Sequence, residues 1–432
     1  MADATYRSVL LDEVQGAVEA AGADAGVAAH YGDPLREQRA LARGTAVADL
    51  SHRGVLTVEG PDRLTWLTTL SSQVLTDLVP GDSAETLFLS VQGRVEFAPH
   101  VLDDGVRTWL IVEAHHAAPL RDWLDRMRFA LRVDVRDRTA EVAVIGATTV
   151  PDHLRAASAE LYAALDGLPR EVTAPGAEQK KTEGEPQRAE AELHPVALPL
   201  MWSDPWPGVV RGGWAYGVVQ GHPAEQTTWH EVLVARDRLV EVLTGPVADG
   251  LGLAGSWAAE ALRIETWRPR MGADTDERTV PHELDWLRTA VHLEKGCYKG
   301  QETVARVHNL GHPPRRLVFL DLDGSEHTVP PAQSEVLLGE RVVGRVTSAQ
   351  LHHEAGPVAL AVVKRSVDPA ADLTVRAPQP ETPEISETTP APGAAGTTDQ
   401  AREQWAAAQT VVVPPEAGQT VQREKGFLRG PR

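Results

Sequence analysis

Short stretches of alternating apolar and polar residues, separated by turns rich in glycine and proline, constrain the fold of this chain more than any other feature. The first series of such strand patterns covers residues 54–58, 85–91, 95–102, 109–112, 133–137 and 142–146. The second series covers residues 315–322, 335–338, 342–350 and 358–364. A segment with apolar residues at helical spacing, residues 118–131, lies between strands of the first series. Several short strands joined by regular turns, as in the second series, predict a small barrel or sandwich.

Two segments lack the apolar side chains that a packed structure requires. Residues 171–193, EVTAPGAEQKKTEGEPQRAEAEL, are nearly free of large apolar groups and are predicted to form a flexible acidic insertion. After Asp368 the composition shifts to proline, alanine, threonine and glutamate. Residues 371–432 are therefore predicted to be a mostly disordered tail, so the folded chain is expected to end near residue 370.

Charge and composition exclude several classes of function. The chain has 42 Lys and Arg residues against 61 Asp and Glu residues, a formal net charge of -19. Nucleic-acid binders usually present a basic field, so no direct nucleic-acid partner is expected. No apolar run is long enough for a transmembrane helix, and the N-terminus does not resemble a signal peptide. A single cysteine cannot form an internal disulfide, which fits a cytoplasmic protein with no membrane partner.

The lone cysteine, Cys297, lies in an unusual setting. Gly296 and Gly300 bracket it, so the backbone can turn tightly on both sides. A helix is predicted to begin about one turn later, and Lys295 and Lys299 flank the thiol. A helix N-terminus and nearby cations favour the thiolate, which would make Cys297 a functional thiol. The alternative is a small buried residue in a tight turn, because free cysteine is among the most buried side chains.

The residues around Cys297 carry a family resemblance. The motif consists of Lys295, Gly296, Cys297, Tyr298, Lys299, Gly300, Gln301 and Glu302. It matches the signature of the YgfZ family throughout, and the run from Val304 to Leu317 resembles that family's continuation. The stretch DLSHRG at residues 49–54 and LRIE at residues 262–265 are similar to T-protein-like folate-binding domains. The chain thus resembles the YgfZ branch of this family over roughly residues 35–370.

The resemblance implies an α+β fold. T-protein-like lobes would occupy residues 35–311 around a central folate channel, and a small β-barrel would occupy residues 312–370. The implied ligand is tetrahydrofolate. The implied function is that of an accessory protein in the assembly or repair of iron–sulfur proteins, with an indirect effect on tRNA modification. The implied partners are iron–sulfur client or assembly proteins.

No metal is expected to be bound stably. A protein-bound iron–sulfur cluster normally needs several thiolates, and this chain has only Cys297. The adjacent pairs His115-His116 and His352-His353 would face opposite ways in a strand, and no metal-binding motif is present.

Two other functions remain open. The first is that of a folate-dependent aminomethyltransferase, one-carbon transferase or demethylase. The glycine-cleavage T-protein has an acidic pair after its early Gly-rich turn, where this chain has Phe97 and Ala98. Glu96 is adjacent, but a shift of one residue in a strand points the side chain to the opposite face. This difference argues against transfer chemistry. The second is that of a folate-binding regulator without catalysis.

Four residues are predicted to contact the ligand. Arg263 is suited to pair with the carboxylate of a folate glutamate tail, because guanidinium groups bind carboxylates in a bidentate manner. The alternative is an internal ion pair with Glu265 or another acid. Glu265 is itself included in the predicted ligand-binding set. His52 and Arg53 precede a strand at the expected channel entrance, where His52 either binds the pterin or caps a turn.

Overall fold

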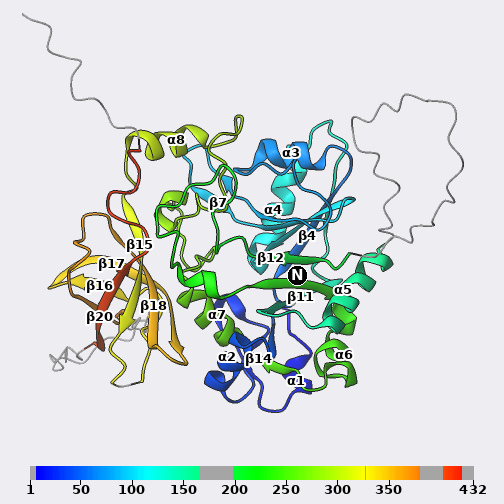
Figure 1. Ribbon diagram of the computed structural model, residues 1–432, viewed down its shortest axis with the longest axis horizontal. Coiled ribbons are helices and arrows are strands. Elements are labelled where there is room, and N and C mark those ends of the chain that lie inside the picture. The colour runs from blue at the N-terminus through cyan, green and yellow to red at the C-terminus, as the bar shows by residue number, and fades with distance from the viewer. Residues whose placement is uncertain (1–5, 166–197, 326, 380–401, 421–432) are drawn as a thin grey trace, which may run out of the picture.

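The computed structural model describes residues 6–165, 198–325, 327–379 and 402–420 (Figure 1). The insertion predicted at residues 171–193 lies outside the described residues. Two five-stranded sheets form the central part of the molecule, and a closed barrel lies beside them (Figure 1). A short N-terminal region contains α1 (Leu10–Glu13) and the hairpin of β1 (Val18–Glu19) and β2 (Ala28–His30).

The first sheet is antiparallel throughout and has the strand order β10-β4-β9-β8-β5. Its strands are β4 (Gly54–Glu59), β5 (Ser83–Glu85), β8 (His100–Asp103), β9 (Arg107–Val112) and β10 (Asp134–Asp137). The apolar faces of α3 (Arg63–Leu70) and α4 (Ala114–Met127) pack on this sheet, with Leu67, Leu120 and Leu124 fully buried. A separate small hairpin joins β6 (Phe88–Leu89) and β7 (Val95–Phe97).

The second sheet has the order β12-β13-β11-β3-β14, and only the β14–β3 pair is parallel. Its strands are β3 (Ala46–Asp49), β11 (Val142–Ala147), β12 (Met201–Ser203), β13 (His230–Ala235) and β14 (Gly252–Ala254). The helices of this region are α2 (Pro34–Ala42), α5 (Asp152–Ala164), α6 (Leu239–Thr244) and α7 (Ser256–Glu265). Helix α7 contacts α2 on one side and the barrel strand β17 on the other, so it links the sheets to the barrel.

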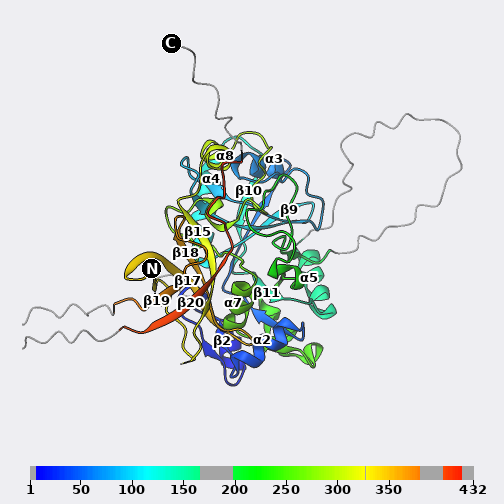
Figure 2. The same ribbon diagram turned by 60° about the vertical axis from the view of Figure 1, so that its left-hand side comes forward.

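The barrel closes in the order β15-β18-β17-β16-β19-β20. Its strands are β15 (Arg315–Leu322), β16 (Glu335–Leu338), β17 (Arg341–His352), β18 (Gly356–Lys364), β19 (Leu373–Arg376) and β20 (Gln404–Val411). Four of these match the second series of strand patterns in the sequence. Strand β20, red in Figures 1 and 2, pairs with both β19 and β15 and so completes the closure.

The predicted end of the barrel at residue 370 is therefore wrong, and part of the supposed tail is ordered. Residues 404–411 are rich in alanine and look like low-complexity sequence by composition. Their burial alternates, however, with Trp405 and Ala407 facing the barrel interior. A strand needs only one apolar face to join a barrel, and small alanine side chains suffice where the partner strands supply bulk.

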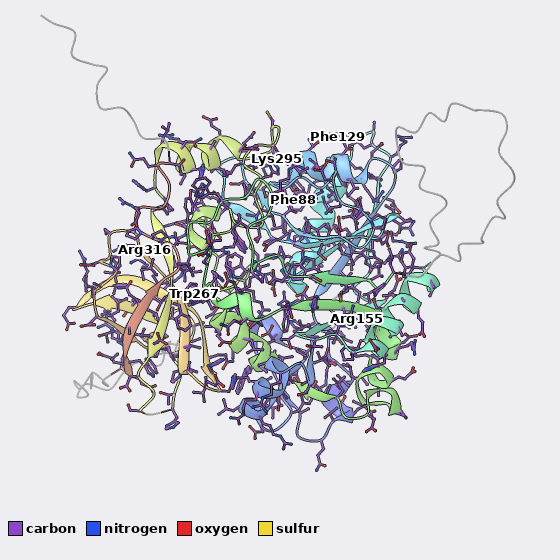
Figure 3. The ribbon with its side chains drawn as sticks, in the orientation of Figure 1. Phe88, Phe129, Arg155, Trp267, Lys295 and Arg316 are labelled. Atoms are coloured by element: carbon purple, nitrogen blue, oxygen red, sulfur yellow. The ribbon has the colours of Figure 1, made fainter. Side chains whose placement is uncertain are left out.

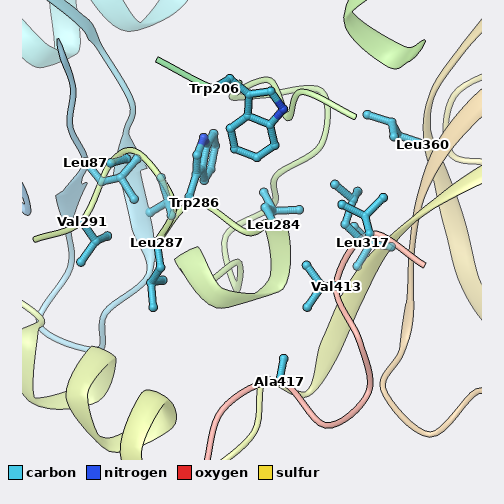
Figure 4. Close-up of a cluster of buried hydrophobic side chains, with 14 of the residues drawn as sticks. Leu87, Trp206, Leu284, Trp286, Leu287, Val291, Leu317, Leu360, Val413 and Ala417 are labelled. Carbon is cyan, nitrogen blue, oxygen red and sulfur yellow. The ribbon is translucent and has the colours of Figure 1, made fainter. Parts of the chain in front are cut away.

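An apolar cluster joins the barrel to the β6–β7 hairpin, to α7 and to residues 284–291 (Figure 4). Residues Val413 and Ala417, which follow β20, lie together with Leu284 and the barrel residue Leu317. Trp267, labelled in Figure 3 where the lobe meets the barrel, lies 6.4 Å from the ring of Phe319 on β15, measured between centroids. After Ala417 the chain passes beside α8 (Gln301–Leu310), the helix that precedes the barrel in the sequence. There the backbone amide of Thr420 donates a hydrogen bond to the carbonyl of His308.

Candidate ligand-binding cavity

A cavity lies where the two sheets, α7 and the segment after α7 converge. Ile111 on β9 and Glu231 on β13 bring the two sheets to its walls, and α7 contributes Leu262. Three indole rings also line it, those of Trp206, Trp229 and Trp286. Flat aromatic walls of this kind suit a flat heterocyclic ligand, because such rings stack with favourable contact over a large area.

The cavity walls carry more acids than bases. Six carboxylates line the cavity: Asp24, Glu85, Glu113, Asp204, Glu231 and Glu260. Four guanidinium groups line it: Arg53, Arg263, Arg268 and Arg270. Six acids against four arginines leave a formal excess of two negative charges with the lining histidines neutral. The interior therefore favours a cation or a hydrogen-bond donor over an anionic group.

Arg270 is the centre of a buried ion network in the cavity wall. Its Nη2 lies 2.7 Å from Asp24 Oδ1 and 2.7 Å from Glu113 Oε2, and its Nη1 lies 2.9 Å from Glu260 Oε1. Arg53 adds a second cation beside Glu113, at 2.5 Å from Oε1. Burial alone would raise the pKa of Glu113, but Arg270 and Arg53 lower it to about 2. Arg53 therefore lines the cavity, with its charge already paired.

Arg263 is held by protein groups through all five of its N–H donors. Its Nε donates to the Glu260 carboxylate at 3.0 Å. Its Nη1 donates to the carbonyl of Arg268 at 2.5 Å and to Asp274 at 2.7 Å, and its Nη2 donates to Glu260 at 2.8 Å and to Ser348 Oγ at 2.6 Å. No donor is left for a folate carboxylate, so the predicted tail contact is replaced by the internal ion pair that the sequence left open. Its acidic partners are Glu260 and Asp274 and not Glu265.

Glu265 and His52 lie outside the cavity lining. The Glu265 carboxylate is half-exposed and lies 3.4 Å from His352 Nε2. The His52 ring is buried, and its Nε2 lies 3.0 Å from Asp24 Oδ1. His52 therefore supports an acid of the cavity wall from behind, and the predicted direct contacts of these two residues with a ligand are not what the geometry shows.

The position of the missing acid is part of the cavity wall. Ala98, just after β7, lines the cavity. Phe97 packs edge-on against His116 at 5.6 Å between ring centroids. The Glu96 carboxylate lies outside the cavity lining and pairs with Lys299 Nζ at 3.0 Å. Glu96 therefore cannot replace the acid, in agreement with the alternation of side chains along a strand.

None of residues 295–302 lines the cavity. Cys297 is exposed on the turn before α8, so the alternative of a buried cysteine is wrong. Tyr298 is buried in the cluster of Figure 4, Gln301 Nε2 donates to the carbonyl of Lys295 at 3.2 Å, and Glu302 is exposed. The motif thus presents one thiol on a turn whose other members anchor it.

Lys295 is one of these anchors. Its ammonium group donates to the backbone carbonyls of Thr68, Ser71 and Gln73, at the C-terminal end of α3. The last carbonyls of a helix have no partner within the helix, and a lysine there also complements the helix dipole. Burial lowers the pKa of Lys295 to about 8.

Gly300 is required by the close contact between the motif and the turn of the β6–β7 hairpin. Its φ is +85°, a conformation that favours glycine, and α8 begins at the next residue. A Cβ at this position would lie 2.6 Å from the carbonyl oxygen of Ser90 and 2.9 Å from the Cα of Gly93. The motif is thereby packed against the segment that leads to Ala98.

We expect Gly300→Ala to lower the free energy of unfolding by roughly 2 kcal/mol, because the new side chain is strained and must displace backbone atoms. The measurement is the urea midpoint of the purified variant. Gly296→Ala is the matched control, since a Cβ there meets no atom within 4 Å and its φ is not positive. Equal midpoints for the two variants would contradict the proposed role of Gly300.

Sequence reasoning missed most of the residues that form the cavity. Glu231 could have been noticed, because a lone acid within the apolar strand β13 indicates a buried carboxylate with a partner. Arg268 and Arg270 gave no local signal, because their partners are distant in sequence. Within the described ranges, no group of three or more His, Cys, Asp or Glu residues is placed to hold a metal ion. No described helix combines the length and the apolar character needed to cross a bilayer.

Comparison with known proteins agrees with this architecture. No protein-family model matches the chain. The aminomethyltransferase of Corynebacterium aurimucosum is 25% identical over 354 residues, which cover 80% of this chain and 86% of that protein. The aminomethyltransferase of Symbiobacterium thermophilum is 26% identical over 343 residues, with coverages of 74% and 78%. The glycine cleavage system aminomethyltransferase T from Bartonella henselae superposes with a TM-score of 0.61 at 19% identity, covering 96% of this chain and 98% of that structure. The predicted T-protein-like fold with a C-terminal barrel is thus confirmed, and the chain has the fold of these aminomethyltransferases.

Proposed function

We propose that this chain binds a reduced folate, tetrahydrofolate, in the cavity and carries out folate-dependent one-carbon transfer of the aminomethyltransferase kind. The observation that carries the proposal is the cavity itself: it is walled by aromatic rings and acids, and it lies between the two sheets of a fold shared with an aminomethyltransferase. The sequence similarity to proteins of that name, over most of the chain, supports the same activity.

The polar groups of the wall support binding of a heterocycle. Guanidinium groups and carboxylates both line the cavity. A pterin ring offers a carbonyl and ring nitrogens to N–H donors, and its amino edge suits carboxylate acceptors.

The excess of acids supports an amine as the second substrate. A protonated amine is stabilised by the negative lining, whereas the anionic glutamate tail of a folate is better placed toward solvent. This arrangement also agrees with Arg263 having no N–H left for that tail.

Binding is tested by calorimetric titration of tetrahydrofolate into the wild-type chain and two tryptophan variants. We expect saturable one-to-one binding by the wild type. Trp229→Leu should raise the dissociation constant about tenfold, because it removes a stacking wall. Trp214→Leu should leave it unchanged, because Trp214 is 45% exposed and outside the cavity lining. Absence of binding by the wild type would contradict the proposal.

Transfer is tested separately, by following the release of ammonia from an aminomethyl donor. We expect release only when tetrahydrofolate and the wild-type chain are both present. Binding without turnover for any amine donor would leave the chain a folate-binding regulator and would contradict the transfer half of the proposal.

A role as an accessory factor for iron–sulfur proteins, of the YgfZ kind, is the second candidate. It is favoured by the exposed Cys297 on its anchored turn and by alanine at position 98 of the cavity wall. Its clients would be iron–sulfur assembly or tRNA-modifying enzymes, with no direct binding of nucleic acid or membrane. In a deletion strain, Cys297→Ala should then fail to restore the activity of iron–sulfur enzymes, whereas Gly296→Ala should restore it. Full restoration by Cys297→Ala would exclude a role for the thiol.

A further inference from the structure

His100 lies two residues beyond Ala98 and lines the same cavity. It is the first residue of β8, and its ring stacks on Trp202 with 3.8 Å between centroids and an angle of 4° between planes. The side chain is 20% exposed, so one part of the ring remains open. The imidazole ring of His100 is therefore held rigidly close in sequence to Ala98, where the acid of the T-protein is absent.

The tautomer of His100 follows from its neighbour Glu231. Nδ1 of His100 lies 2.8 Å from Glu231 Oε2. Glu231 is buried, and its carboxylate is paired with the His100 ring. An ionised carboxylate can only accept hydrogen bonds, so Nδ1 carries the proton and Nε2 of the neutral ring is an acceptor. In the described part of the chain, Nε2 has no hydrogen-bond partner, and it is not among the fully buried atoms without one.

The geometry points to His100 as the general base of this cavity, with Glu231 as its positioning residue. The inference rests on the proposed one-carbon transfer and assigns its proton-accepting group. A nucleophilic nitrogen of the bound substrates forms a bond to the transferred carbon. The bond from that carbon to the donor's leaving group breaks, and its electron pair goes to the leaving group. The proton of the nucleophilic N–H moves to Nε2 of His100 and is later returned to the leaving amine.

Acidic side chains outnumber basic ones near His100. Glu85 on β5 is paired with His100 in the sheet register, and Glu231 on β13 lies 2.8 Å from its Nδ1. Asp204 also lines the cavity, and Arg268 lies between Asp204 and Glu85, at 3.0 and 2.8 Å. A proton accepted by Nε2 therefore enters a predominantly acidic part of the cavity wall.

The test compares His100→Gln with wild type, using His153→Gln as a control for a half-buried histidine outside the cavity. Glutamine can still donate to Glu231 but cannot accept a proton. We expect tetrahydrofolate affinity within about threefold of wild type. The transfer rate should fall about 10²- to 10⁴-fold. His153→Gln should behave like wild type.

Glu231→Gln tests whether Glu231 fixes the tautomer and orientation of the His100 ring. The ¹⁵N chemical shifts of His100 at pH 9 should show protonated Nδ1 and unprotonated Nε2 in the wild type, and a mixture of tautomers in Glu231→Gln. Transfer at the wild-type rate by His100→Gln, or a protonated Nε2 in the wild type, would overturn the inference while the proposed function stands. Folate binding without turnover by the wild type would overturn both.

Discussion

Replacing Arg270 with methionine is expected to destabilise the protein by about 3–5 kcal/mol. Methionine matches much of the length of the side chain but leaves Asp24, Glu113 and Glu260 without their shared cation. All three carboxylates lie in a wall from which water is largely excluded, and removal of one partner from a buried ion network costs this much because uncompensated charge stays buried. The measurement is the urea midpoint at pH 7, and Arg121→Met, which removes an exposed pair with Asp122, is the control.

The pH dependence of the stability lost in Arg270→Met shows whether unpaired charge causes the loss. Without Arg270, the pKa values of the network carboxylates should rise in the folded state, so these groups take up protons on acidification and lose their unfavourable charge. The deficit relative to wild type should therefore shrink as pH falls from 7 toward 4. A deficit that stays constant over this range would mean that lost packing, and not unpaired charge, explains the destabilisation.

The same network shows why the site could be predicted from the sequence only in outline. Asp24 and Arg270 are separated by 246 positions, so no local pattern connects them. Arg263 was correctly singled out, but whether its charge faces a ligand or another side chain depends on Glu260, one helical turn away, and on Asp274 and Ser348. Local sequence indicates that a buried arginine needs acceptors, and only the packed structure shows which groups supply them.

The fold was predictable where periodicity was strong. The barrel strands β15 to β18 follow alternating apolar residues closely, and the structure confirms them. Strand β20 was missed because only Trp405 and Ala407 of its residues are buried and the adjoining sequence is polar, so composition outweighed alternation. Its pairing with β15 joins residues about ninety positions apart, for example Val318 with Val411, which a short window cannot detect.

His282 is expected to make the protein sensitive to mild acid. It lies in a short 3₁₀ segment (Pro281–Leu284), is fully buried, and its Nε2 donates to the carbonyl of Val304 at 3.0 Å. Burial lowers its pKa to about 3, against about 6.5 in an unfolded chain. The unfolded state therefore binds a proton that the folded state does not bind. The free energy of unfolding falls by roughly 1.4 kcal/mol for each pH unit below 6.5. His116 and His222, whose pKa values burial lowers to about 4, act in the same direction.

Between pH 6.5 and 4.5, comparison of the wild type with a His282 variant separates the contribution of His282 from those of His116 and His222, because both proteins retain these two residues. Glu113 titrates lower, between the ordinary glutamate pKa and about 2. Over these two pH units His282 should cost the wild type about 2–3 kcal/mol. His282→Gln keeps a donor for Val304 and cannot be protonated, so the difference in unfolding free energy between pH 6.5 and 4.5 should be smaller by that amount. His327→Gln, at an exposed position, should retain the wild-type slope. An unchanged slope in His282→Gln would show that His282 is not the group that couples acid to unfolding.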